Sequence, residues 1–224
     1  ILFENVNFDL KVGGILEIFG RNGAGKTSLI KTIFGSQNEK AEIYDCEIFL
    51  DDTVNVGIYQ QEIDAEFFEM NLKDAIEKVY LDQNLPISEE KIRRILSQYL
   101  FNLEDFETPI SQLSGGQKQR LLAAKAILKD SYLYILDEAV SNIDDYSKEI
   151  VLNAFDSIKE GKIIIVISHD LETVTNSDNI YVVKDKKIIE EGTHDKLIEE
   201  NSLYRKLFTD QQQLKSKFLA KEVE

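Results

Sequence analysis

The sequence predicts an α/β protein whose sheet is mainly parallel and covered by helices on both faces. Apolar runs without polar alternation at residues 15–19, 132–136 and 163–167 are typical of strands buried on both sides. Amphipathic helical patterns separate these runs, as expected for parallel strands. The 224 residues, 43% of them hydrophobic, suffice for the core of one large domain.

The first elements follow in the order strand, loop, helix. After the run at residues 15–19, a glycine-rich loop leads into a helix over residues 26–34 with an apolar stripe at Leu29, Ile30 and Ile33. Between residues 43 and 59, the short runs EIFL and VNVGIY predict an antiparallel patch beside the main sheet. Gln61 would lie just past the last strand of this patch.

The middle of the chain, residues 64–112, has a helical pattern. Ser88 can cap a helix there, whose apolar positions are Ile92, Ile95, Leu96, Tyr99 and Leu100. From Leu113 onward, helices and strands alternate, residues 178–192 read as a hairpin turning at 185–187, and a helical tail begins at Thr193. We expect one domain over 1–224, built from a first core part with the antiparallel patch (1–61), a helical subdomain (62–112) and a second core part (113–224).

Composition excludes several classes of function. A net charge of −15 argues against binding of a nucleic-acid backbone, which needs a basic surface. The single cysteine, Cys46, cannot form an internal disulfide, which suits a reducing compartment. No apolar run approaches the roughly 20 residues of a membrane span. The chain begins at Ile1 within a strand-like segment, and its only methionine, Met70, lies far from the N-terminus. We therefore expect the chain to be part of a longer polypeptide.

Residues 20–27, GRNGAGKT, fit a phosphate-binding loop (the P-loop) between the predicted strand and helix. Glycines allow backbone N–H groups to point at phosphate oxygens, Lys26 reaches the β- and γ-phosphates, and Thr27 can ligate Mg²⁺. A chance match in an unrelated turn is the competing interpretation, and the flanking strand and helix argue against it. The expected contacts are Gly20, Asn22, Gly23, Ala24, Gly25, Lys26, Thr27 and Ser28.

Polar side chains follow two other predicted strands. Asp137 and Glu138 end an apolar strand, where Asp137 could hold Mg²⁺ through water and Glu138 could polarise an attacking water. His169 follows another strand and could donate to a γ-phosphate, whereas His194 at a helix start is expected to be structural. Solvation of strand ends is the ordinary alternative for these groups.

Residues 113–120, LSGGQKQR, place a serine and glycines directly before a helix. Such a segment is either an ordinary helix cap or a second anion site built from backbone donors. With GRNGAGKT, ILDE, SNID and SHD in the same order, LSGGQKQR resembles the nucleotide-binding domain of ATP-binding-cassette (ABC) transporters over nearly the whole chain. The resemblance implies a RecA-like P-loop NTPase core with an antiparallel β subdomain and a helical subdomain carrying the signature segment (residues 113–117).

By this resemblance two such domains dimerise head to tail, and ATP lies between Lys26 of one and the signature segment of the other. Glu138 matches the catalytic glutamate, His169 the switch histidine and Gln61 the Q-loop residue, which also approaches Mg²⁺ as Thr27 and Asp137 do. The residues matched to the opposite nucleotide are Ser114, Gly115, Gly116, Gln117 and Asp144. An adenine-stacking aromatic would lie before Ile1.

The segments EAVSNID and EEGTHDKLIEENSLYRKLF resemble exporters, in which this domain follows transmembrane helices of the same polypeptide at the cytoplasmic face of the membrane. The departures are FETPISQ before the signature segment, Lys125 in place of arginine, and Asp170, which is common in importers. An importer ATPase, a soluble ABC-type ATPase acting on DNA or ribosomes, and a regulatory cassette that binds ATP without hydrolysis are the alternatives. The acidic charge and the intact motifs argue against the last two, and the transported substrate is left open.

Overall fold

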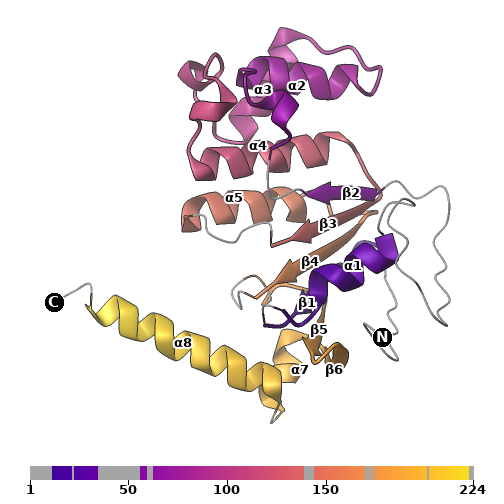
Figure 1. The fold of residues 1–224 in the computed structure, drawn as a ribbon, viewed down its shortest axis with the longest axis vertical. Helices are drawn as coiled ribbons and strands as arrows, with labels where there is room; N and C mark the ends of the chain where they lie inside the picture. The colour runs from indigo at the N-terminus through magenta and orange to yellow at the C-terminus, as the bar shows by residue number, and fades with distance from the viewer. Residues whose placement is uncertain are drawn as a thin grey trace. The chain divides into compact units, whose positions relative to one another are not determined.

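The computed structural model describes residues 12–21, 23–34, 56–59, 63–138, 144–169, 173, 175–200 and 202–221 (Figure 1). The chain forms two compact units, which we call unit 1 (residues 1–50 and 165–224) and unit 2 (residues 51–164). The predicted division of a single domain into three parts stays a prediction. No helix in the described ranges has the length and hydropathy needed to cross a membrane.

Unit 1 is built on strands in the order β4-β1-β5-β6. Strand β1 pairs in parallel with β5, and β5 pairs in antiparallel with β6. Strand β4 begins in unit 2, and most of its length lies in unit 1. The elements are β1 (Ile15–Phe19), α1 (Lys26–Phe34), β4 (Ile163–Ser168), β5 (Asn179–Lys184), β6 (Lys187–Gly192), α7 (His194–Glu199) and α8 (Leu203–Lys221).

The predicted hairpin is confirmed as β5 and β6. Its turn residues Asp185 and Lys186 have φ of 48° and 63°. Positive φ at both central positions is typical of two-residue hairpin turns, because the twist of such a turn matches the twist of the two strands. Beyond the hairpin, Thr193 caps α7 by accepting from the Lys196 N–H at 3.4 Å. The helical tail predicted from Thr193 is therefore also confirmed.

The core of unit 1 lies between β1, β5 and the two C-terminal helices. Phe19 packs edge-to-face on Tyr204, with ring centroids 5.9 Å apart. Glu190 of β6 holds the start of α8, because its carboxylate accepts from the backbone N–H groups of Leu203 and Tyr204 at 2.6 and 2.9 Å. The acidic side chain suits the positive end of the helix dipole.

Unit 2 combines a pair of parallel strands with a stack of helices (Figure 1). Phe155 of α5 packs edge-to-face on Tyr59 and Tyr134, from neighbouring strands. Helix α4 lies between α5 on one side and α2 on the other. The elements are β2 (Val56–Tyr59), η1 (Ala65–Phe67), α2 (Leu72–Leu81), α3 (Glu89–Gln98), η2 (Leu103–Asp105), η3 (Ile110–Gln112), α4 (Gly115–Leu128), β3 (Leu133–Asp137) and α5 (Asp145–Asp156).

Two expectations are wrong in unit 2. Val56–Tyr59 was expected in the antiparallel patch but pairs in parallel with β3, with Ile58 opposite Ile135. The pairing partner of a short strand is set by segments distant in the sequence, which the local pattern does not show. The run EIFL of that patch lies outside the described residues. Helix α3 is capped by Ser88 as expected but ends at Gln98, and Leu100 has φ of 56° and is 46% exposed.

We predict that Leu96→Ala will lower the free energy of unfolding by about 2–5 kcal/mol, because Leu96 is fully buried in α3 and its loss leaves a cavity. The matched control is Leu100→Ala, which should change it by less than about 0.5 kcal/mol. Urea titration followed by circular dichroism measures both, and equal effects of the two variants would contradict the assignment of the helix face.

Candidate nucleotide-binding site

The P-loop connects β1 to α1 in unit 1, as predicted. Gly23 and Gly25 have φ of 80° and 98°, a backbone region that side chains with a Cβ rarely adopt. A turn bond from the Ala24 N–H to the Arg21 carbonyl at 3.1 Å closes the loop. The loop therefore has the curvature that allows backbone N–H groups to face an anion at the start of α1.

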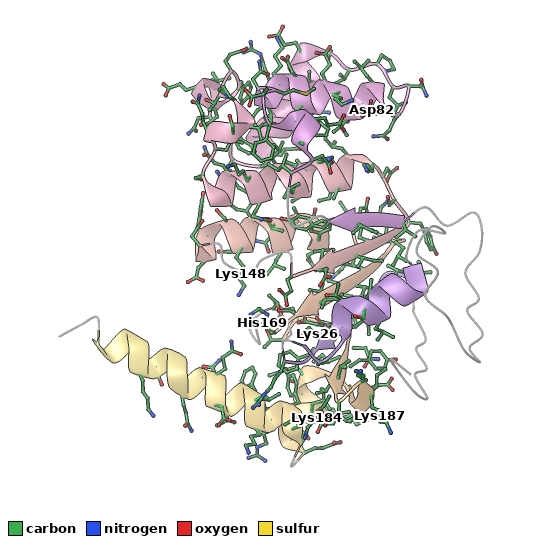
Figure 2. All side chains as sticks on the ribbon, in the orientation of Figure 1. Lys26, Asp82, Lys148, His169, Lys184 and Lys187 are labelled. Carbon is green, nitrogen blue, oxygen red and sulfur yellow. The ribbon has the colours of Figure 1, made fainter. Side chains whose placement is uncertain are left out.

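Lys26 opens α1 and is 5% exposed (Figure 2). Its Nζ donates to the carbonyl oxygens of Gly20 at 2.7 Å and Arg21 at 3.1 Å. The ammonium is thus held over the mouth of its own loop, where phosphate oxygens would be. Thr27 and Ser28 follow in the first turn of α1 and are partly exposed.

Asp137 and Glu138 lie in unit 2 at the carboxyl end of β3. Both are partly exposed, whereas the preceding strand residues are buried. Glu138 has φ of 49°, which is unusual for a residue with a long side chain. Backbone of this kind occurs at turns and at functional sites, so the chemical role expected for Glu138 stays a prediction.

The two histidines have different surroundings. His169 is exposed and directly follows the buried end of β4. His194 begins α7, where its Nδ1 lies 2.7 Å from the Tyr204 hydroxyl and its ring packs against Phe208 at 5.0 Å. Burial raises the pKa of Tyr204, so this hydroxyl stays protonated at neutral pH. The contacts of His194 agree with the structural role expected for it.

The signature segment forms the N-terminus of α4 in unit 2. Ser114 Oγ accepts from the Gln117 N–H at 3.2 Å, and Gln117 Oε1 accepts from the Ser114 N–H at 2.9 Å, which makes a capping box. Gln117 also donates to Asp105 at 3.1 Å. Ser114 and Gly115 are exposed, so the positive end of α4 faces solvent.

Asp144 caps α5 by accepting from the Ser147 N–H at 2.8 Å, and this hydrogen bond lowers the pKa of Asp144. Gly116 lies directly against this cap, because a Cβ there would be 2.6 Å from Asp144 Oδ2 and closer still to Ser147 Oγ. Arg120, one turn further along α4, is 3.4 Å from Ser147 Oγ. The starts of α4 and α5 are therefore in close contact.

Sequence reasoning missed several of these positions. Arg120 and Ser147 join the signature segment to the Asp144 cap, and the signal that could have found Arg120 is its spacing of one helical turn from Gly116. Glu17, in the middle of β1, was counted within an apolar run although it is charged.

Gln61 and Asn22, both predicted site residues, lie outside the described residues. Unit 1 brings the P-loop and His169 together, and unit 2 brings together the signature segment and Asp144.

Comparison with known proteins identifies the family of the chain. Residues 3–141 match the family described as ABC transporter. The chain belongs to this family. It is an ABC ATPase domain with the P-loop NTPase fold.

Several individual proteins are similar to the chain. The chain is 31% identical over 228 residues to an ATP-dependent lipid A-core flippase of Haemophilus influenzae, covering 94% of this chain and 38% of that protein. It is 33% identical to the energy-coupling factor transporter ATP-binding protein EcfA of Pediococcus pentosaceus, over 90% of this chain and 76% of the relative. A bacterial Atm1-family ABC exporter with ATP bound has the same fold, with a TM-score of 0.74 at 20% identity over 94% of this chain and 39% of the exporter.

We predict that Gly116→Ala will destabilise the ABC ATPase domain by about 1–3 kcal/mol, because the added methyl group must push the starts of α4 and α5 apart. Gly115→Ala is the matched control, since a Cβ at Gly115 meets nothing within 4 Å, and its effect should stay within about 0.5 kcal/mol. Urea unfolding of both variants checks the prediction, and it is wrong if the two are equally stable.

Proposed function

We propose that this domain binds MgATP at the P-loop and hydrolyses it, and that a second nucleotide-binding domain completes the site through its signature segment in a head-to-tail dimer. The observation that carries the proposal is the pair of helix starts that follow glycine-containing segments, α1 after the P-loop and α4 after Ser114. Each presents backbone N–H donors and a positive helix end. Because Ser114 Oγ only accepts within its capping box, its own proton is left to donate to a γ-phosphate across the dimer.

In this proposal each of four residues has its own role in ATP binding and hydrolysis. Lys26 leaves the carbonyl groups of its loop and donates to the β- and γ-phosphates, while P-loop amides hold the remaining oxygens. The Glu138 carboxylate takes the proton of the attacking water, whose oxygen bonds to the γ-phosphorus as the bond to the bridging oxygen breaks and ADP leaves. His169 donates to the γ-phosphate, and Gln61 orients the water.

The donors available for a metal fit Mg²⁺. Thr27 offers a hydroxyl in the first turn of α1, and Asp137 offers a partly exposed carboxylate at the end of β3; both are the hard oxygen ligands that Mg²⁺ prefers. Bound Mg²⁺ would neutralise charge on the phosphates.

We further propose that the domain powers export through transmembrane helices of the same polypeptide and works at the cytoplasmic face of the membrane. The chain spans 38% of the flippase it resembles, which leaves room in such a relative for a membrane part. The relative EcfA, of which the chain covers 76%, favours a second candidate, an importer-type ATPase subunit. Nothing in the acidic surface favours DNA or ribosome binding.

We predict that Lys26→Ala will weaken ATP binding about 10- to 100-fold, because a charge-assisted hydrogen bond to phosphate is lost. Isothermal titration calorimetry with MgATP measures the dissociation constant. Lys217→Ala, on the exposed face of α8, is the control and should bind as the parent does. Unchanged affinity of Lys26→Ala would overturn the placement of ATP at the P-loop.

We predict that Glu138→Gln will bind ATP with the parent affinity and lose turnover about 10²- to 10⁴-fold, because the amide cannot accept the proton of the attacking water. Phosphate release measures turnover, and size-exclusion chromatography with ATP should show an accumulated dimer. Glu160→Gln, at an exposed position after α5, serves as the control. Full turnover in Glu138→Gln would remove Glu138 from the mechanism.

A further inference from the structure

Glu17 is a charged residue at the centre of an otherwise apolar strand. It is fully buried in β1, between Leu16 and Ile18, which are also buried. A carboxylate in such a place is costly unless hydrogen bonds replace its hydration. Here Oε1 lies 3.1 Å from Thr173 Oγ1, and Oε2 lies 3.1 Å from Ser177 Oγ.

Proton counting gives the direction of these hydrogen bonds. Thr173 Oγ1 lies within bonding distance of Glu17 and also 3.0 Å from Ser168 Oγ. A hydroxyl group has one proton, and a carboxylate can only accept. Thr173 therefore donates to Glu17, and its hydrogen bond with Ser168 Oγ continues the chain of bonds to the end of β4.

This chain of bonds, the Glu17 network (Glu17, Ser168, Thr173 and Ser177), joins the two neighbouring strands of unit 1 that lead into functional segments. Strand β1 leads into the P-loop, and β4 ends at Ser168, directly before His169 (Figure 2). Thr173 and Ser177 lie beyond His169 in the sequence. Ser168, directly before His169, therefore bonds to Thr173, and Thr173 and Ser177 bond to Glu17 in the strand that leads into the P-loop.

We propose that Glu17 is a positioning residue for ATP hydrolysis, whose buried carboxylate, through Thr173, Ser177 and Ser168, sets the place of His169 relative to the P-loop. This inference rests on the proposed function and adds a residue that touches neither nucleotide nor water. A purely structural role for Glu17 would affect folding but not the turnover of folded protein. The two roles are therefore separable by experiment.

The test compares Thr173→Val, which removes the hydroxyl at nearly constant volume, with Thr173→Ser, which keeps it. Thr108→Val removes a hydroxyl that bonds only locally to the Glu104 carbonyl and serves as the control. We expect kcat of Thr173→Val to fall about tenfold with KM for ATP nearly unchanged, since misplacement of a group that acts in the transition state lowers kcat. Thr173→Ser and Thr108→Val should keep the parent kcat.

A double-mutant cycle then asks whether the effect passes through His169. In a His169→Ala background, Thr173→Val should lower kcat no further, because the group that it positions is already gone. Equal losses in both backgrounds would overturn the proposal, as would a parent kcat in Thr173→Val.

A readout that needs no hydrolysis separates this inference from the proposed function. The chain has two histidines, so imidazole NMR signals can be assigned with His169→Ala. Thr173→Val should shift the His169 signal and leave that of His194, which is held by Tyr204. An inactive parent protein with a shifted His169 signal would count against the proposed function alone, whereas an unshifted signal would overturn the positioning role of Glu17.

Discussion

The positive N-terminal end of a helix is the physical feature on which the proposed function of this ABC ATPase domain depends. The first N–H groups of a helix lack intrahelical partners and point along the positive end of its dipole. The domain places one such start after β1, at Lys26, and another after Ser114. Glycines precede or begin both helices, and Ser114 caps α4 through the N–H of Gln117.

Close packing around these helix starts determines which residues the loops can contain. Gly116 is required less for its flexibility than for its size, since the cap of α5 at Asp144 and Ser147 occupies the space of a side chain. Arg120 extends the same contact by one turn, although its Nε is buried without a hydrogen-bond partner among the described residues. The signature segment and the Asp144 cap thus form one packed element of unit 2.

Much of the fold followed from periodicity and turn chemistry. The apolar runs became β1, β3 and β4, Ser88 and Thr193 capped helices as expected, and the hairpin turned at Asp185. Failures occurred where local pattern could not decide. The run that includes β2 pairs in parallel with β3 because strand pairing depends on partners distant in sequence.

The sequence by itself determined the family, the P-loop, the strand-end carboxylates and the signature segment, because short motifs encode local backbone geometry and donor sets. Only the tertiary structure decided what surrounds them. Glu17 looked like a minor interruption of an apolar strand, and its significance depends on hydroxyl groups at Thr173 and Ser177, more than 150 positions away along the chain. Long-range hydrogen bonds of this kind leave no periodic trace, because they depend on where separate elements meet in the folded protein.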